Sequence, residues 1–292
     1  MDRPRGSDFR EVRHRPWRDF DSVRRAATNA VAGLGFGVAL ARKDAADRSS
    51  RGDNKRFSEA FPGVPAAGEF DFGPNRAHVE LTAAEATLAQ MTIPFAISLY
   101  NEYLVETVML FERWKATGLT RAPESLTLGE LGTHLQDAHG VALTGHQGEL
   151  LELLAHTRNR VIHYGGRAGS HLLQLRRGLS GEAESAWERV AQRPFPDPVV
   201  GEPLVLNRRD AAAALAVVDH AASELNFTMR ETFSVRFWAD VAVEDYIEQF
   251  PRPWHSDDRA QREKAIGGYV ARDYATVGIS ELDIAESVAR YS

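Results

Sequence analysis

The sequence predicts an all-α protein, and three observations support this fold class. From residue 81 onward, apolar residues recur at the 3.6-residue spacing of amphipathic helices. Only residues 199–206 favour strands, because Val199-Val200 and Leu204-Val205-Leu206 flank Gly201 and indicate a short β-hairpin. Three helical segments also open with a capping box, in which Thr is followed three residues later by Glu or Gln: Thr82 with Glu85, Thr127 with Glu130, and Thr144 with Gln147.

Residues 1–76 are predicted to form an Arg-rich N-terminal extension that is partly disordered. The segments 1–16 and 42–76 are rich in Arg, Gly, Pro, Asp and Ser, which favours loops. A helix over 17–41 is expected to be weak because three glycines interrupt it.

The central region, residues 77–233, is predicted to be a helical domain. Pro94 fits the first turn of a helix, so a short helix is expected to end before it and a long one to begin there. Gly140 and Gly165-Gly166 are expected to end helices, and Asn207 to cap one. The predicted helices are 82–90, 94–115, 128–139, 144–164, part of 167–193, and 208–233.

Residues 234–292 are predicted to form a helical C-terminal extension. Three helical pieces are expected there, with Pro251 and Pro253 breaking the pattern. Neither this extension nor the N-terminal extension carries a motif that indicates a particular chemistry.

The composition limits the classes of function. The chain of 292 residues is 43 % hydrophobic, as expected of a folded protein. It has no Cys, which excludes a disulfide framework, a thiolate metal site and a cysteine nucleophile, and fits a cytoplasmic protein. The net charge of −6 argues against nucleic-acid binding by overall charge, so any contact with RNA has to be local.

One segment loosely resembles an export signal. Arg24-Arg25 precede a charge-free run of 16 residues, 26–41, that ends in Ala-Leu-Ala. The run begins late, is rich in Ala and Gly, and is short for a membrane span. We therefore expect a cytoplasmic protein with no membrane association.

The most informative segment is Arg158-Asn159-Arg160-Val161-Ile162-His163-Tyr164-Gly165-Gly166, at the end of a predicted amphipathic helix. Its helix has an apolar stripe that is expected to be buried, formed by Leu150, Leu153, Leu154, Thr157 and Val161. A neighbouring polar stripe follows steps of three and four residues and contains Glu149, Glu152, His156, Asn159 and His163.

Three residues of this segment form a candidate catalytic site. Asn159 and His163 are i,i+4 neighbours, so the amide can orient the imidazole. Histidine is the residue type suited to proton transfer near neutral pH. Arg158 points about 140° away from His163 around the helix. This geometry favours a site shared across a two-fold interface, where two copies supply the same residues.

The Arg-Asn-x3-His segment resembles the motif of the HEPN (higher eukaryotes and prokaryotes nucleotide-binding) superfamily, whose ribonucleases carry Arg, a polar residue, a short spacer and His. Arg158, Asn159 and His163 match that motif. The order of predicted helices around it agrees, and the resemblance covers about residues 80–233. It implies an HEPN-like helical bundle that forms a homodimer through the motif helices.

The resemblance also implies metal-independent RNA cleavage without a cofactor. The ribose 2′-OH attacks the adjacent phosphate, with His163 as general base or acid and Arg158 stabilising the charge of the transition state. Asn159 would orient His163 or the phosphate. Further RNA contacts are expected from Arg160, His156 and Tyr164, and Glu102 is expected to support Arg158 from a neighbouring helix.

A metal site is not expected, although six of the 10 His are close in sequence. No two of them are i,i+4 with a Glu between, as a zinc-protease helix requires. The six are His134, His139, His146, His156, His163 and His171. Glu102 and Glu106 are interpreted as one solvated helix face.

Other classes of function stay open. The setting implied by analogy with stand-alone family members is a toxin or an anti-phage defence effector, controlled by an antitoxin or a sensor protein. One alternative is a catalytically silent HEPN-like module that binds a nucleotide or a partner. Another is an adaptor whose extensions, 1–76 and 234–292, recruit other proteins.

Overall fold

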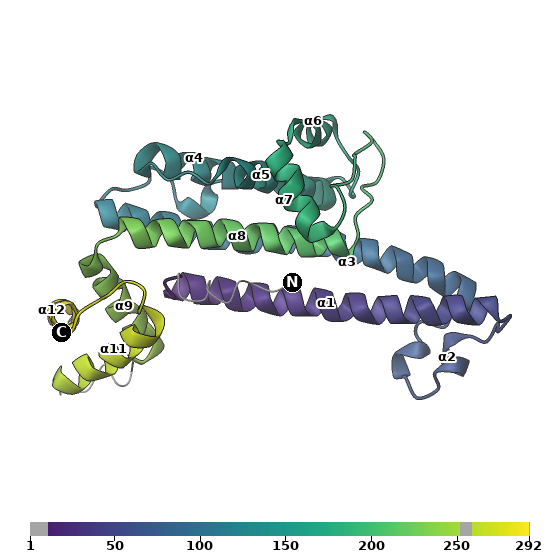
Figure 1. Cartoon of the computed structure of the whole chain (residues 1–292), viewed down its shortest axis with the longest axis horizontal. Helices are drawn as coiled ribbons and strands as arrows, with labels where there is room; N and C mark the ends of the chain where they lie inside the picture. Colours follow the sequence, from purple (N-terminus) through teal and green to yellow (C-terminus); the bar gives the residue numbers. More distant parts are fainter. Residues whose placement is uncertain (1–10, 252–258, 292) are drawn as a thin grey trace. The chain divides into compact units, whose positions relative to one another are not determined.

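The computed structural model describes residues 11–251 and 259–291. These residues form eleven α-helices and no strand, which confirms the all-α class (Figure 1). The helices are α1 (Arg15–Ser50), α2 (Phe57–Ala60), α3 (Pro74–Lys115), α4 (Leu128–His139), α5 (Gly145–His163), α6 (Ser170–Gly178), α7 (Gly181–Ala191), α8 (Arg208–Thr232), α9 (Val235–Gln249), α11 (Arg259–Asp273) and α12 (Glu281–Tyr291).

The chain divides into two compact units, and each is built from segments that are distant in the sequence. Of the described residues, unit 1 comprises 11–23, 99–144, 219–251 and 259–291. Unit 2 comprises residues 24–98 and 145–218. The boundaries fall inside α1, α3 and α8, so each of these helices contributes to both units.

The prediction of a weak, short helix near the N-terminus was wrong. One continuous helix, α1, covers Arg15–Ser50. Packing explains why a glycine lies within it: Gly35 is buried, and a Cβ at this position would lie 2.9 Å from Cδ of Arg208. Glycine thus permits a close approach to α8 within unit 2, and this contact offsets part of its poor helix propensity.

The expected break at Pro94 does not occur, because α3 runs through it from Pro74 to Lys115. An internal proline costs a helix about 3 kcal/mol. Ile93 and Ala96 are completely buried on either side of it, and burying a large aliphatic side chain contributes about 1.5–3 kcal/mol. The hydroxyl of Thr82 donates to the His78 carbonyl inside the helix (2.8 Å), so it does not cap a helix start.

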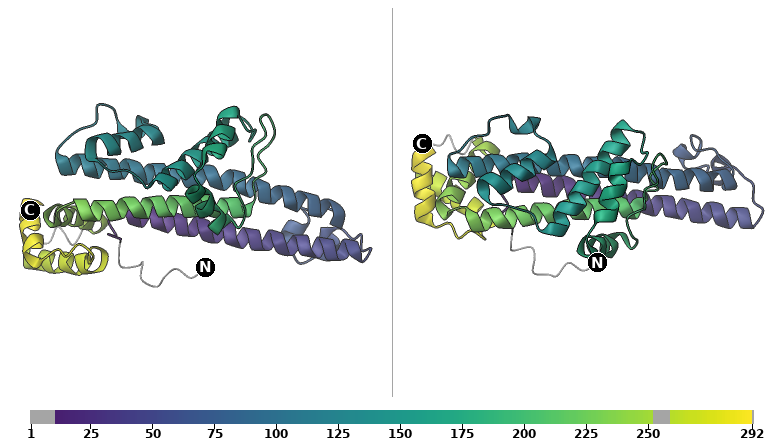
Figure 2. Two further views of the ribbon diagram at one scale, coloured as in Figure 1. Left: turned by 45° about the horizontal axis from the view of Figure 1, so that its top comes forward. Right: turned by 90° about the horizontal axis from the view of Figure 1, so that it is seen from above.

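Unit 2 joins the adjacent parts of α1 and α3, which run alongside each other (Figure 2). Glu85, expected in a capping box, instead accepts a hydrogen bond from Nη1 of Arg42 at 2.9 Å. The segment 51–73, predicted as loop or disorder, contains α2 and a small aromatic cluster around Phe57. Four phenylalanines take part in it: Phe57, Phe61, Phe70 and Phe72.

The hairpin expected at 199–206 is absent from the structure. Gly201 donates to the Ala168 carbonyl (2.9 Å), and Leu204 donates to the Gly166 carbonyl (2.9 Å). These backbone groups therefore bond to the turn after α5 and not to one another. Leu204 and Leu206 are buried, whereas Val199, Val200 and Val205 are exposed.

In unit 1, the described part of the C-terminal extension, residues 234–251 and 259–291, contains the helices α9, α11 and α12 (Figure 1). Their core is aromatic and includes Trp238 and Tyr274, both completely buried. Residues 11–14 lie against the same unit, because the Asn226 amide side chain accepts from the Val12 N–H (2.8 Å) and donates to the Val12 carbonyl (2.9 Å).

Of the three predicted capping boxes, only the one at Thr127 forms, and the predicted cap at Asn207 also forms. Thr127 and Glu130 form a reciprocal capping box at α4, which ends at Gly140 with a φ of 70°. The Asn207 side chain accepts from the Arg209 N–H (2.8 Å) at the start of α8. Thr144 makes no capping box, because its N–H and hydroxyl both donate to Glu224.

Candidate functional site at the end of α5

The helix α5 ends where the sequence predicts, in a turn with two glycines. Gly165 and Gly166 have φ values of 58° and 74°, the left-handed conformation that glycine adopts without strain. The N–H groups of Tyr164 and Gly166 donate to the Arg160 carbonyl at 3.1 and 3.0 Å. Because Leu204 donates to Gly166, the end of the motif helix is held by a segment nearly 40 residues later in the chain.

Upstream of this turn, the apolar stripe of α5 lies as predicted. Leu150, Leu153 and Leu154 are completely buried, and so is Thr157. Val161, the last member of the predicted stripe, is only half-buried. The burial fixes the rotation of α5 and therefore the direction in which its polar residues point.

Arg158 and Asn159 contact each other. Nη1 of Arg158 donates to Oδ1 of Asn159 at 2.9 Å, and both side chains are half-buried. The Asn159 oxygen was expected to orient His163, but Arg158 occupies it in this conformation. The sequence could not show this, because neighbouring residues diverge around a helix and only the long Arg side chain closes the gap.

His163 is exposed and forms no hydrogen bond with the residues that the structure describes. Its imidazole has an edge contact with the ring of Tyr164, with 6.5 Å between the ring centroids. Tyr164 is 57 % exposed and Ile162 is 47 % exposed. The end of α5 therefore offers an imidazole beside uncovered apolar surface.

Arg160 stabilises the turn after α5. Its Nε donates to the Arg167 carbonyl at 2.5 Å, and its guanidinium carbon lies 3.9 Å from the centre of the Tyr164 ring. A Cβ at Gly169 would come within 3.1 Å of Nη1 of Arg160. Arg160 thus has a positioning role here, and its expected contact with RNA remains a prediction.

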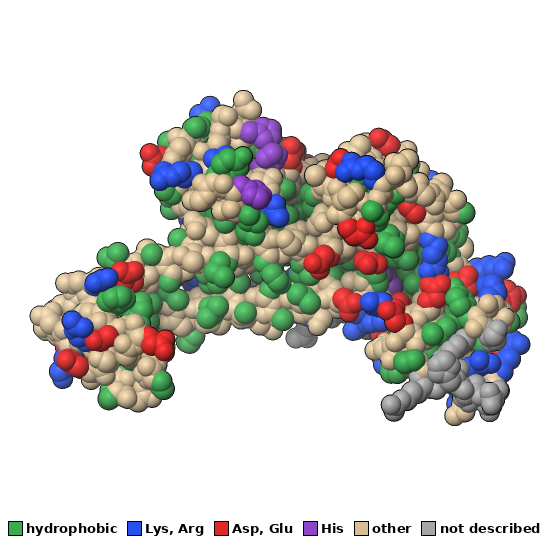
Figure 3. Space-filling model, turned by 180° about the vertical axis from the view of Figure 1, so that it is seen from behind, with side chains coloured by type: hydrophobic (Ala, Val, Ile, Leu, Met, Phe, Trp, Pro, Cys, Tyr) green, Lys and Arg blue, Asp and Glu red, His purple; other side chains and the backbone are tan. Residues whose placement is uncertain are grey.

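His156 is brought beside His171 of α6 and Glu152 of α5. The Nε2 atoms of the two histidines are 3.2 Å apart, and the donor atoms of all three residues lie within 4.8 Å of one another. Burial and the neighbouring His171 lower the pKa of His156, while Glu152 opposes the shift. Figure 3 shows histidines gathered on one part of the surface.

The cluster of Glu152, His156 and His171 was not predicted from the sequence. Two histidines four residues apart on one helix are the usual sequence signal of a metal site, whereas His171 lies on α6, the helix after the one that carries His156. The available signal was Glu152 and His156 at i,i+4, followed by a histidine just beyond a glycine turn.

A second cluster with the same residue types lies in unit 1. Oε1 of Glu112 lies 2.6 Å from Nε2 of His134 and 2.7 Å from Nε2 of His139. Burial alone would raise the pKa of Glu112, but its hydrogen bonds with the two imidazoles lower it below the ordinary value. The cluster ties the end of α3 to α4.

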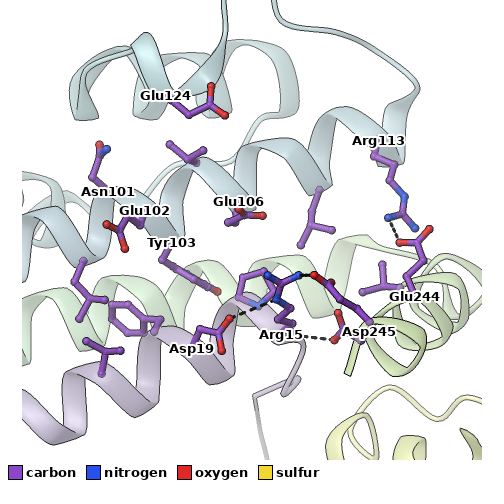
Figure 4. A pocket seen from close by; sticks show the side chains of 18 residues that line it. Arg15, Asp19, Asn101, Glu102, Tyr103, Glu106, Arg113, Glu124, Glu244 and Asp245 are labelled. Atoms are coloured by element: carbon purple, nitrogen blue, oxygen red, sulfur yellow. Dashed lines mark hydrogen bonds and ion pairs between the residues drawn. The ribbon is translucent and has the colours of Figure 1, made fainter. Parts of the chain in front are cut away.

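Glu102, expected to support Arg158, lies in unit 1, where it lines a pocket of about 580 Å³ (Figure 4). Arg15 and Arg113 line the same pocket, and each forms ion pairs there with carboxylates. Acidic residues outnumber them, so the pocket disfavours phosphates. The acidic residues are Asp19, Glu102, Glu106, Glu124, Glu244, Asp245 and Glu248.

Comparisons with known proteins found no protein similar to this chain. No family model matches the chain, and no curated protein or solved structure matches it significantly. Within residues 11–251 and 259–291, no helix combines the length and the apolar character needed to cross a bilayer.

Proposed function

We propose that this chain is a metal-independent endoribonuclease of the HEPN type. One observation carries the proposal: the exposed imidazole of His163 lies at the end of α5, one helical turn after the Arg158–Asn159 pair. These are the residues of the Arg-Asn-x3-His motif. An accessible imidazole and a guanidinium supply a proton-transfer group and a phosphate-binding cation.

The reaction follows from these two groups. A neutral His163 takes the proton from a ribose 2′-OH, and the 2′ oxygen attacks the adjacent phosphorus. The P–O5′ bond breaks, the leaving 5′ oxygen takes a proton from a second imidazole, and a 2′,3′-cyclic phosphate remains. Arg158 stabilises the additional negative charge that the phosphate carries in the transition state.

In the simplest arrangement, the second imidazole is that of His163 in a second copy of the chain. Within one chain, Arg158 and His163 point about 140° apart around α5. A two-fold axis near the end of α5 would place the Arg158 of each copy opposite the His163 of the other. Ile162 and Tyr164, both well exposed, provide apolar surface for such a homodimer.

The biological setting we propose is a toxin or anti-phage defence effector in the cytoplasm, acting on RNA and controlled by an antitoxin or sensor protein. This part of the proposal rests on the resemblance of the motif to HEPN ribonucleases. The absence of Cys from the chain fits a cytoplasmic location.

One observation favours a second candidate, a silent HEPN-like module that binds a nucleotide or a partner. Arg158 engages the Asn159 amide, so the amide does not orient His163 in this conformation. A module of this kind needs Arg158 for phosphate binding but does not need His163.

The test is cleavage of total RNA in the presence of EDTA by wild type, His163→Ala and Arg158→Ala. Losing the proton-transfer group is expected to lower the rate by about 100- to 10,000-fold. Losing the cation is expected to lower it by about 100- to 1,000-fold. The products should carry 2′,3′-cyclic phosphates.

The matched control is His78→Ala, because His78 is also an exposed helical histidine of unit 2. It should cleave at the wild-type rate, and all variants should elute at one size. Cleavage by His163→Ala at the control rate would refute the assignment. RNA binding without cleavage by wild type and by His163→Ala would support the silent module.

A further inference from the structure

The imidazoles of His156 and His171 face each other through their Nε2 atoms. These atoms are 3.2 Å apart, the ring centroids are 4.3 Å apart, and the ring planes are inclined by 77°. Zinc–imidazole bonds are about 2.0–2.1 Å long, so two imidazoles on one tetrahedral zinc ion have nitrogens roughly 3.3 Å apart. The observed separation therefore matches two ligands of one ion.

A proton shared between two neutral imidazoles would give a similar separation, so the third residue is decisive. Glu152 precedes His156 by four residues and lies on the same face of α5. One of its carboxylate oxygens lies within 4.8 Å of a ring nitrogen of each imidazole. Glu152 has no hydrogen bond or ion pair with another described residue, and its exposed side chain can rotate toward the imidazoles.

The backbone holds these three residues in place. His171 is the second residue of α6, and the next residue, Leu172, is almost completely buried. The connection between α5 and α6 is held to a distant segment, because Ala168 donates to the Glu202 carbonyl at 2.9 Å. Because the backbone positions are fixed, binding of a metal ion would need only side-chain rotation.

The cluster around Glu112 has the same composition but a different geometry. Its carboxylate oxygen lies only 2.6 and 2.7 Å from the two imidazole nitrogens. These separations are those of charge-assisted hydrogen bonds and are too short for two ligands of one ion. Of the two clusters that the described residues form, only the one on α5 and α6 contains two imidazole nitrogens separated like two ligands of one ion.

We propose that Glu152, His156 and His171 bind a divalent transition-metal ion of the zinc class. Two imidazoles and a carboxylate are ligands that Zn²⁺ accepts, and the exposed position leaves its fourth coordination site to water. The ion would link α5 to α6. His156 lies two helical turns, roughly 10 Å along the helix axis, before His163, so this site is separate from the residues to which cleavage is assigned.

The test uses the full chain without a histidine tag, stripped of metal and titrated with Co²⁺ and then with Zn²⁺. We expect one equivalent of Co²⁺ with the visible absorption of tetrahedral coordination, displaced by Zn²⁺. His171→Ala should weaken Zn²⁺ binding at least roughly 100-fold, because even substitutions beyond the ligands cost 10- to 100-fold. Glu152→Gln should weaken it less.

The matched control is His134→Ala, which removes a histidine from the other cluster and should bind Zn²⁺ like wild type. A wild type that binds no Co²⁺ or Zn²⁺ would overturn the proposal. So would a variant His171→Ala with unchanged affinity, or loss of binding in His134→Ala. Because Glu152 is exposed, Glu152→Gln keeps the test valid if a histidine variant fails to fold.

The readout is independent of RNA cleavage. His163→Ala should keep the full Zn²⁺ affinity, whether or not the chain proves to be a ribonuclease. Conversely, cleavage in EDTA should be the same for wild type and His171→Ala.

Discussion

The two clusters of one Glu and two His differ in environment, and this difference separates a structural role from a ligand-binding one. In unit 1, Glu112 is 7 % exposed, and its carboxylate is hydrogen-bonded to His134 and to His139 on the last turn of α4. In unit 2, Glu152 and His171 are exposed and face solvent. Identical residue types thus stabilise a helix junction in one place and leave an open donor set in the other.

The largest effect is expected from breaking the buried cluster. Glu112→Ala removes the acceptor of two hydrogen bonds and leaves the His134 and His139 imidazoles without it. We expect a loss of about 3 kcal/mol in the free energy of unfolding, since hydrogen bonds to charged groups contribute about 1.5–3 kcal/mol each. Urea-induced unfolding of wild type and Glu112→Ala measures this loss of unfolding free energy.

Glu152→Ala is the matched comparison for that experiment. In metal-free buffer, the unfolding midpoint of Glu152→Ala should equal that of wild type. The Glu152 side chain is exposed and has no hydrogen-bond partner among the described residues, so its removal breaks no stabilising contact. Equal destabilisation by the two substitutions would remove the distinction between the clusters.

A somewhat smaller effect is expected from adding metal. At a Zn²⁺ concentration 100 times its dissociation constant, a ligand that binds only the folded state stabilises it by about 2.7 kcal/mol. Thermal unfolding of wild type and His134→Ala should shift upward by similar amounts. Thermal unfolding of His171→Ala should not shift.

The smallest effect is a dependence on acid pH. The pKa of Glu112 is lowered in the folded state, so its stabilising contribution is present above the ordinary glutamate pKa of 4.5 and is lost as pH falls through the folded pKa. The difference in unfolding free energy between wild type and Glu112→Gln should therefore shrink on acidification below pH 4.5. A difference that grows on acidification would contradict the sign of this shift.

The elements that could be predicted from the sequence are those with local causes. The capping box at Thr127 and the stop at Gly140 define α4, and both depend on residues within one turn. The end of α5 at Gly165-Gly166 was predictable for the same reason. Helix type and the buried stripe of α5 follow from periodicity alone.

The wrong predictions concern features that depend on distant residues. Pro94 lies inside α3 because Ile93 and Ala96 are buried beside it, and no local pattern shows that burial. Gly35 lies in α1 where Arg208 approaches closely, and that approach depends on a residue far away in the sequence. The approach of His171 to His156 likewise depends on the course of the chain between α5 and α6.

The hydrogen bonds between residues 166–168 and 201–204 have a consequence for the order of folding. Helix α5 can form as soon as its own residues are made, because its hydrogen bonds are local. Its last turn also closes locally, through the bonds from Tyr164 and Gly166 to the Arg160 carbonyl. The connection after it is fixed only once the polypeptide has been extended beyond Leu204, since the Gly166 carbonyl accepts from the N–H of that residue. During synthesis, the surroundings of His163 therefore acquire their final geometry late, after most of unit 2 has been made.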